Sequence, residues 1–233
     1  MFPSPYLPAR FRRSLLTGLC CYSLTSVAFA QDWVPVYEEP KHRPVFENEQ
    51  VLILDVNLPP GYVSLYHEHR LDTLYVTLSG TQVYAQPLGG EQRHADVKTG
   101  VLRFSSDNHD LPLIHRVGNI GQAPFHIIGV GIKTEGSNTE SPIEGDMQGL
   151  ERVEEKSHAA VYRIRLEPGE KSGVHTHKLP FTRVYLTGGS VLDGAGEAAQ
   201  VKAGTFLWQE GGVTHRHENA GDTPIEVVEV QAR

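Results

Sequence analysis

The chain has 233 residues, a formal net charge of −7 and only two cysteines. Residues 1–30 contain three arginines and no acid, so a chain that begins at Gln31 carries a net charge of −10. Such an acidic protein lacks the cationic face that nucleic acids and anionic lipid surfaces require. We therefore expect the protein to bind a small molecule, and neither nucleic acid nor a membrane. The sequence does not decide whether the protein forms a homodimer.

The first 30 residues have the pattern of a secretory signal peptide. Arg10, Arg12 and Arg13 precede an uncharged, largely apolar stretch, and residues 28–30 form an Ala-x-Ala cleavage site. The stretch is short and polar for a membrane-spanning helix. We expect cleavage after Ala30 and a periplasmic or secreted mature protein. Both cysteines lie in the segment that is removed, so the mature chain has no disulfide.

The remainder of the chain contains an internal repeat. A Pro-Gly pair, five residues and a His-x-His motif occupy residues 60–69 and again residues 168–177, at an offset of 108. A His-x3-Asn-x-Gly-x2-Pro motif occupies residues 115–124 and again residues 215–224, at an offset of 100. The first copy therefore carries an extra segment before its second motif, within residues 105–113. A repeat of this kind predicts two similar domains.

Each copy has the pattern of short strands separated by glycine and proline. Residues 51–58 and 161–166 alternate apolar and polar side chains, as half-buried strands do, and no segment shows a sustained helical period. The prediction is an all-β protein with two tandem barrels. Its expected parts are a signal peptide (1–30), an N-terminal arm (31–45), a first barrel (46–133), a linker (134–156) and a second barrel (157–233). The arm is either a loose tail or packs across one barrel.

Six histidines occupy equivalent places in the two copies. Residues i and i+2 of a strand point to the same face, so each His-x-His motif places two imidazoles inside its barrel, and the later motif adds a third. A lone His-x-His is commonly a surface strand, but duplication of the whole spacing favours metal binding. Three neutral imidazoles suit divalent Fe, Mn, Zn, Ni or Cu and leave coordination positions open. The candidate ligands are His67, His69 and His115 in the first copy and His175, His177 and His215 in the second.

The same motifs resemble those of the cupins. Residues 61–80 and 169–188 resemble the first cupin motif, and residues 100–119 and 204–219 resemble the second. The resemblance implies two cupin barrels, which are jelly-roll sandwiches, each with a metal site. It does not imply one activity, because cupins include dioxygenases, decarboxylases, isomerases, lyases, storage proteins and sugar-binding regulators.

One departure from the cupin pattern bears on the chemistry. The family commonly has a glutamate ligand where this chain has Thr73 and Phe181, and the neighbouring Asp72 should face the other side of its strand. We therefore expect three-histidine sites with no Asp or Glu ligand. This resembles the three-histidine cupin dioxygenases and places oxalate-decarboxylase-like chemistry in doubt.

Strand alternation also predicts which residues surround each metal. Tyr75 and Thr77 should face the first barrel's interior, and Phe181, Arg183 and Tyr185 the second. Tyr75, Arg183 and Tyr185 are the candidate catalytic residues. A buried arginine needs an anionic partner, which for Arg183 is either a substrate carboxylate or an internal acid such as Glu210. The second barrel is favoured as the active one, because the first is expected to have no cation.

The other histidines have no partner at a suitable spacing. His217 lies two residues beyond His215 and is expected in an exposed turn rather than beside the metal. The rest are expected on the surface or in loops: His42, His94, His109, His126 and His158.

The leading functional hypothesis is an exported, metal-dependent enzyme that acts on a small oxygenated molecule, with a three-histidine dioxygenase as the nearest analogy. One alternative is a metal-dependent lyase or isomerase in which a tyrosine or glutamate moves protons. Another is a non-catalytic protein that binds a metal or a small ligand.

Overall fold

The fold is described from a computed structural model that covers residues 32–134, 136, 142–194 and 196–233. The expected signal peptide lies outside this part of the chain. The described residues contain one helix, the 3-10 helix η1 (Val36–Glu38), and no helix that is long and apolar enough to cross a membrane. All other regular elements are strands, so the expected all-β architecture with two barrels is confirmed.

The first barrel consists of two five-stranded sheets, in the orders β1-β4-β9-β6-β7 and β2-β3-β10-β5-β8. Sequence neighbours are often separated in these orders, so the chain crosses repeatedly between the sheets and closes a sandwich. The strands are β1 (Val34–Pro35), β2 (His42–Glu47), β3 (Val51–Leu58), β4 (His67–His69), β5 (Asp72–Ser79), β6 (Gln82–Pro87), β7 (Arg93–Asp96), β8 (Leu102–Ser105), β9 (Leu113–Asn119) and β10 (Phe125–Ile132).

The second barrel repeats this arrangement, with β15 shorter than its counterpart β5 and with the short strands β19 and β20 in place of β9. Its sheets have the orders β12-β13-β21-β15-β18, β11-β14-β19 and β17-β16-β20. The strands are β11 (Ile143–Gly145), β12 (Leu150–Glu155), β13 (Ala159–Leu166), β14 (His175–His177), β15 (Phe181–Tyr185), β16 (Gly189–Asp193), β17 (Ala199–Val201), β18 (Phe206–Gln209), β19 (Val213–His215), β20 (His217–Asn219) and β21 (Ile225–Ala232).

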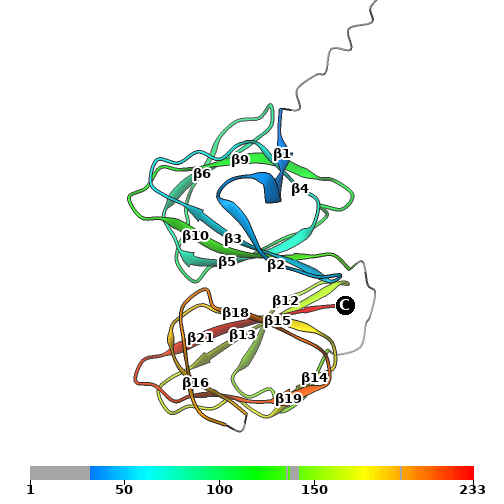
Figure 1. The fold of residues 1–233 in the computed structure, drawn as a ribbon, viewed down its shortest axis with the longest axis vertical. Helices are drawn as coiled ribbons and strands as arrows, with labels where there is room; N and C mark the ends of the chain where they lie inside the picture. Colours follow the sequence, from blue (N-terminus) through cyan, green and yellow to red (C-terminus); the bar gives the residue numbers. More distant parts are fainter. Residues whose placement is uncertain (1–31, 135, 137–141, 195) are drawn as a thin grey trace, which may run out of the picture. The chain divides into compact units, whose positions relative to one another are not determined.

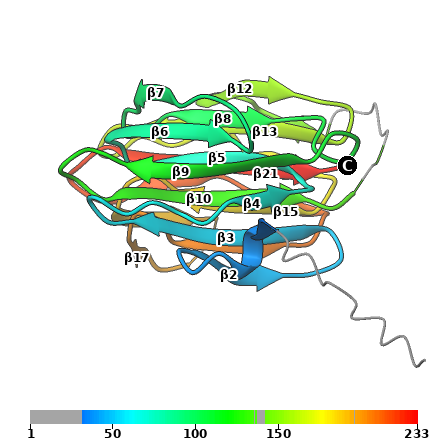
Figure 2. The ribbon, with the colours of Figure 1, turned by 90° about the horizontal axis from the view of Figure 1, so that it is seen from above.

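The two barrels share a hydrophobic core. Figure 1 shows the β2-β3-β10-β5-β8 sheet of the first barrel facing the β12-β13-β21-β15-β18 sheet of the second, and Figure 2 shows the same strands from above. Ile53 and Val130 of the first barrel and Val161 and Val228 of the second belong to one buried cluster. Each fully buried aliphatic side chain stabilises the fold by about 1.5–3 kcal/mol.

This shared core changes the expected role of β3. The strand was expected to be half-buried, but both of its faces are covered along Val51–Leu54. Val51 and Ile53 face the other barrel, whereas Leu52 and Leu54 belong to the cluster inside their own barrel. The unbroken apolar run at residues 51–54 is the sequence feature that corresponds to burial on both faces.

The segments on either side of the first barrel are also part of the sheets. The N-terminal arm pairs β1 in parallel with β4, and β2, which spans the expected boundary at residue 45, pairs with β3. The expected linker at residues 134–156 contains β11 and β12, which pair with β14 and β13. The extra segment before the second motif lies between β8 and β9, where the backbone N–H of Asn108 donates to Asp72 at 2.8 Å.

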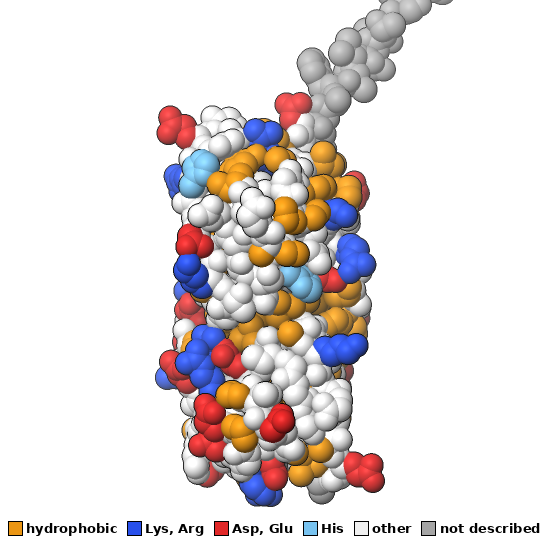
Figure 3. All heavy atoms as spheres, turned by 90° about the vertical axis from the view of Figure 1, so that its left-hand side faces the viewer, with side chains coloured by type: hydrophobic (Ala, Val, Ile, Leu, Met, Phe, Trp, Pro, Cys, Tyr) orange, Lys and Arg blue, Asp and Glu red, His pale blue; other side chains and the backbone are white. Residues whose placement is uncertain are grey.

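The outer surface carries charges of both signs. Figure 3 shows acidic and basic side chains interspersed over one face, with hydrophobic side chains mostly in the half that belongs to the first barrel and at the junction. An interspersed pattern of this kind gives no single-sign field over that face.

Candidate metal centres

Strand pairing brings the three histidines of the first copy together. His67 and His69 lie on β4, and His115 on β9 is the direct cross-strand partner of His67. The ring centroids of His67 and His115 lie 4.7 Å apart, those of His67 and His69 4.9 Å, and those of His69 and His115 5.0 Å. One nitrogen from each ring lies within 4.8 Å of the others. The three side chains could therefore hold one metal ion.

The nitrogens of this group are oriented as metal ligands require. The Nδ1 of His67 lies 2.9 Å from the carbonyl oxygen of Leu65, which favours the tautomer with its proton on Nδ1 and leaves Nε2 as a lone-pair donor. This Nε2 is buried and has no hydrogen-bond partner among the described residues. The Nε2 atoms of His69 and His115 face each other at 3.1 Å. An orphaned buried nitrogen beside two converging ones fits a bound cation.

Burial keeps these imidazoles neutral. It lowers the pKa of His67 to about 4 and that of His115 to about 3, and it lowers the pKa of His69 well below its ordinary value. The neighbouring histidines lower each pKa further, because two adjacent charges repel. Neutral imidazole is the form that binds a metal, so the group is ready for a cation at neutral pH.

A fourth imidazole, which the sequence analysis had placed on the surface, lies against this group. His42 on β2 is buried, and its ring centroid is 4.4 Å from that of His67. Its Nδ1 donates to the buried carboxylate of Glu39 at 2.5 Å, and Tyr62 donates to the same carboxylate at 2.8 Å. Burial by itself would raise the pKa of Glu39, but the hydrogen bonds from His42 and Tyr62 lower it to about 2. Only the Glu-x2-His spacing could have pointed to this pair.

The first barrel is hollow beside its histidines. A cavity of about 470 Å³ is lined by His69 and His115 and by the expected inward residues Tyr75 and Thr77. The hydroxyl of Tyr75 lies 3.2 Å from Nδ1 of His69, and burial raises the pKa of Tyr75 to about 12. Its phenol is therefore protonated at neutral pH. The expectation that this barrel has no cation is wrong, because Arg103 on β8 pairs directly with Tyr75 and lines the same cavity.

The histidines of the second copy also converge. His175 and His177 lie on β14, and His215 on β19 is the direct partner of His175. Ring centroids lie 4.5 Å apart for His175 and His215, and 5.0 Å apart for His177 with each of the other two. All three side chains are buried. Phe181 stacks on His177 with a centroid distance of 3.8 Å, so this position packs against a histidine, and its aromatic side chain offers no ligand atom.

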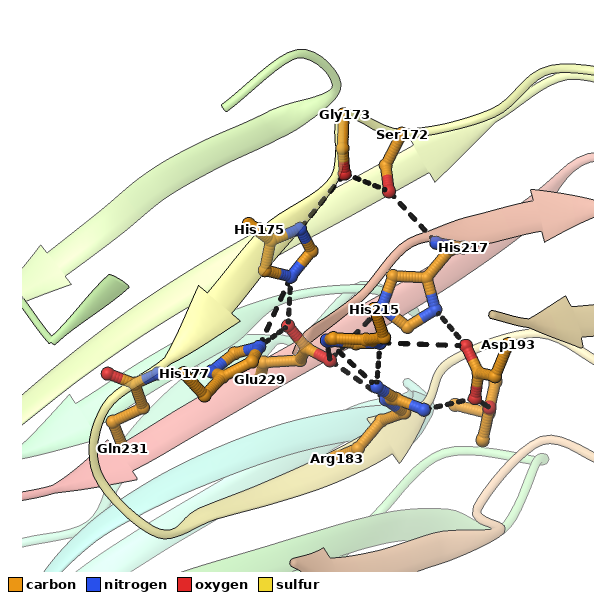
Figure 4. A network of polar contacts seen from close by, with 11 residues as sticks. Ser172, Gly173, His175, His177, Arg183, Asp193, His215, His217, Glu229 and Gln231 are labelled. Carbon is orange, nitrogen blue, oxygen red and sulfur yellow. Dashed lines mark hydrogen bonds and ion pairs between the residues drawn. The ribbon is translucent and has the colours of Figure 1, made fainter. Parts of the chain in front are cut away.

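A carboxylate that the sequence analysis missed lies among these imidazoles. Glu229 on β21 is fully buried, and its Oε2 is 3.1 Å from Nε2 of His177 (Figure 4). Together with His175, His215 and His217 it forms a group that could hold a metal ion. The second barrel therefore differs from the expected three-histidine set.

Arg183 is held by internal acids. Its Nε donates to Glu229 at 2.8 Å, its Nη1 pairs with Asp193, and its Nη2 lies 2.9 Å from Nδ1 of His215 (Figure 4). The expected internal partner Glu210 lies elsewhere, 3.4 Å from the indole nitrogen of Trp208. Of the two alternatives left open for Arg183, the structure shows the internal acid, but the acids are Glu229 and Asp193 rather than Glu210. The guanidinium also competes with any metal for His215 and Glu229.

His217 and Tyr185 complete this network. His217 is fully buried, contrary to the expected exposed turn, and lies 2.8 Å from Asp193 and 3.1 Å from Glu229. Burial and Arg183 would lower the pKa of His217, but the two carboxylates outweigh them and raise it. Burial would raise the pKa of Glu229, yet Arg183 and His217 hold it well below its usual range. The hydroxyl of Tyr185 lies 3.3 Å from Asp193 rather than in an open pocket.

The remaining histidines lie away from both groups. His126 pairs with Asp55 at 2.8 Å, and His158 pairs with Asp72 at 3.0 Å. Asp72 thus contacts His158 and Asn108 and faces away from the metal-site histidines, as the alternation of its strand predicts. His94 and His109 are exposed.

The two interiors differ at four equivalent positions. In the second barrel, charged or ionisable side chains occupy all four, and they form the network around Arg183. In the first, small or weakly polar residues stand there, and the cavity lies beside them. In the first barrel, Tyr75 pairs with Gly129 and Ala85 pairs with Val117 across neighbouring strands. In the second barrel, Arg183 pairs with Glu229 and Asp193 pairs with His217 in the same way. The equivalent residues are Tyr75 and Arg183, Ala85 and Asp193, Val117 and His217, and Gly129 and Glu229.

Comparison with known proteins supports the fold and part of the assignment. Residues 162–231 match the family described as Cupin domain. A stretch of 69 residues, 29% of this chain, is 35% identical to an oxalate-binding protein of Thermotoga maritima and spans 57% of that protein. The chain thus spans little more than half the length of this curated relative. The second barrel therefore matches the cupin domain at the level of sequence.

Solved structures extend the similarity over most of the chain. AerE from Microcystis aeruginosa is similar with a TM-score of 0.57 and 11% identity, over 84% of this chain and 98% of that one. Oxalate decarboxylase from Bacillus subtilis is similar with a TM-score of 0.55 and 15% identity, over 79% of this chain and 68% of that one. At these identities the likeness concerns the fold alone, and it confirms the expected cupin barrels. The Bacillus subtilis enzyme is described with Mn(II) centres.

Proposed function

We propose that the first barrel is the working centre of a metal-dependent protein that binds and transforms a small oxygenated organic molecule. The observation that carries this proposal is that His69 and His115 line a large cavity and converge with His67, whose buried Nε2 has no hydrogen-bond partner among the described residues. Such pockets, with a few polar groups in an apolar lining, are the usual sites of small-molecule chemistry. This choice departs from the sequence-based preference for the second barrel, because Arg183 and Tyr185 are engaged with internal acids.

The donor set favours a transition metal and oxygen chemistry. His67, His69 and His115 would hold the ion, and three neutral ligands leave it with its full charge and with open positions. A divalent metal there would act as a Lewis acid and, if it were iron or copper, would support a dioxygenase-type reaction. Manganese, already among the candidate metals, is supported by the Mn(II) centres described for oxalate decarboxylase.

The cavity residues have separate roles in this proposal. Tyr75 orients His69 through its hydroxyl and presents a protonated phenol to the cavity. Arg103 supplies a positive charge on the same wall. Because no Asp or Glu lines this cavity in the described chain, Tyr75 is the natural proton donor for the lyase or isomerase alternative.

A non-catalytic binding function is the second candidate. It is favoured by the same lack of a lining carboxylate and by the oxalate-binding protein to which a 69-residue stretch of the chain is similar. In that case the first barrel would hold a metal and a ligand without turnover.

Metal analysis of matched variants tests the proposal. We expect His67→Ala to remove about one metal per chain and to abolish both ligand binding and any oxygen consumption. The matched change His175→Ala, at the equivalent place in the second barrel, should leave the first site loaded. Unchanged metal content in His67→Ala would refute the proposal. Ligand binding without oxygen consumption or product, in loaded protein, would favour the binding function.

We also propose that the protein is exported and cleaved after Ala30, from the pattern of its first 30 residues. N-terminal sequencing of protein from a bacterial periplasm or culture medium should begin at Gln31. Recovery of Met1 in a cytoplasmic fraction would contradict it.

A further inference from the structure

The cavity of the first barrel is polar at one end and apolar at the other. His42, His69, His115 and Tyr75 lie at the metal end. Away from it, the inward residues of β10 and β3 are aliphatic or aromatic: Ile127 pairs with Val56, and Phe125 pairs with Leu58.

The strand register gives the depth of the apolar part. Gly129 pairs with Tyr75 at the metal end, and Phe125 is four residues away along β10. Four residues of extended strand span about 13 Å. The cavity of about 470 Å³ would hold on the order of fifteen waters at about 30 Å³ each. A two-carbon ligand such as oxalate would leave most of this apolar volume unfilled.

Two exposed arginines, Arg93 and Arg103, give the lining of the cavity positive charge. Arg103 on the edge strand β8 pairs with the inward Tyr75, and Arg93 on the edge strand β7 pairs with Ala85, which lines the cavity. Residues directly opposite in an antiparallel pair point to the same side of the sheet, so both arginines turn toward the cavity. Arg103 and His115 line the same cavity.

Nothing in the described chain neutralises these charges. The guanidinium groups of Arg93 and Arg103 have no carboxylate partner among the described residues, and no Asp or Glu is among the residues that line the cavity there. In the second barrel, by contrast, Arg183 is neutralised by Glu229 and Asp193. A cavity lined by two arginines without a carboxylate partner, and by metal ligands, favours an anionic ligand.

We propose that the first barrel takes an apolar monocarboxylate, whose carboxylate lies between Arg103 and the histidine group and whose hydrocarbon body extends toward Phe125 and Ile127. This inference rests on the proposed metal centre, and it assigns that centre a substrate class larger and less polar than oxalate. An arginine can bind a carboxylate with two parallel hydrogen bonds, and each buried methylene favours binding by about 0.8 kcal/mol.

Calorimetric titration of the metal-loaded protein with four probes tests the proposal. The probes are hexanoate, its neutral amide hexanamide, acetate and oxalate. Hexanoate should bind at least tenfold more tightly than each of the other three, with a negative heat-capacity change from apolar burial. Oxalate binding as tight as hexanoate, or hexanamide binding as tight as hexanoate, would overturn the inference.

Two variants test the charge of Arg103 and the width of the cavity independently. Arg103→Gln should weaken hexanoate at least tenfold and leave hexanamide unchanged, whereas the control Arg152→Gln, an exposed arginine on β12 of the second barrel, should change neither. Val56→Phe narrows the apolar part, where Val56 pairs with Ile127, and should weaken hexanoate more than acetate. Equal effects of Arg103→Gln and Arg152→Gln would refute the role of Arg103.

Metal content, measured on every sample, distinguishes this inference from the proposed function. If the protein prefers hexanoate but holds no metal at His67, His69 and His115, the metal centre fails and the ligand class stands. If metal is present but hexanoate has no preference, the ligand class fails and the metal centre stands.

Discussion

Replacing Glu229 by glutamine should destabilise the second barrel strongly. Glutamine has nearly the same shape, so the change removes a charge and creates no cavity. Glu229 is fully buried, and its carboxylate lies 2.8 Å from Nε of Arg183 and 3.1 Å from Nε2 of both His177 and His217. Without it, Asp193, which is partly exposed, is the one carboxylate among the described residues that still pairs with the buried guanidinium.

The magnitude follows from the burial of both partners. Breaking a buried ion pair by removing one partner costs about 3–5 kcal/mol, because the other charge stays desolvated. For a chain of this length, 1 kcal/mol corresponds to about 2–4 °C in the melting temperature, so the expected loss is roughly 6–20 °C. The matched control is Glu218→Gln on β20, whose partner Lys171 is exposed and whose ion pair is worth about 0–1 kcal/mol.

Urea unfolding measures this difference. Trp208 packs against the core between the barrels, so its fluorescence reports the transition. The measurement should be repeated with a chelator, since a counterion role toward Arg183 predicts the same loss of stability with and without metal. A loss below about 1 kcal/mol, equal to that of Glu218→Gln, would refute the reasoning. So would a loss that disappears when metal is removed.

Three further outcomes are expected. Burial lowers the pKa of His67 to about 4 and of His115 to about 3 from an ordinary 6.5, so below about pH 6.5 the unfolded chain binds more protons than the metal-free fold. The free energy of unfolding of the metal-free protein should therefore be highest above pH 6.5 and decrease as the pH drops toward 3. Urea midpoints that do not change over this range would contradict this prediction. Asp72→Asn should leave metal content unchanged but cost about 1.5–3 kcal/mol, because Asp72 accepts a hydrogen bond from Asn108 and none from a metal-site histidine; loss of metal on elemental analysis would refute this. Ile53→Ala should cost about 2–5 kcal/mol in urea unfolding, because Ile53 is fully buried between the barrels; a cost below 1 kcal/mol would place it outside the core.

Much of the fold and of the histidine geometry could be predicted from the repeat. The i and i+2 spacing places His67 and His69 on one face of a strand whatever the tertiary structure is. The later His-x3-Asn-x-Gly-x2-Pro motif recurs at an offset of 100 instead of 108, and its shared pattern indicates that His115 and His215 occupy equivalent places. Local periodicity and duplication are enough for this, because neither depends on which strands pair.

The carboxylates inside the second barrel could not be predicted from the cupin motifs, because Asp193 and Glu229 lie outside residues 169–188 and 204–219. One sequence signal was available. Glu226 and Glu229 stand three residues apart in the apolar strand β21, so they face opposite sides of the sheet and one of them must point inward. Only the register of β15 against β21 shows that Glu229 is the glutamate that points inward and that it lies opposite Arg183. Arg103 was missed for the same reason, since its partner Tyr75 is fixed only by the pairing of β5 with β8.

The shared core has a consequence for any attempt to study one barrel by itself. A fragment ending after β10 would expose to water the aliphatic face that the second barrel now covers, including Val51, Ile53, Val76 and Val130. Contiguous apolar patches of this kind drive association, so the isolated half should self-associate or precipitate. The first barrel thus depends on the second barrel for its solubility. Substitutions designed to alter the cavity of the first barrel should therefore be tested in the intact chain.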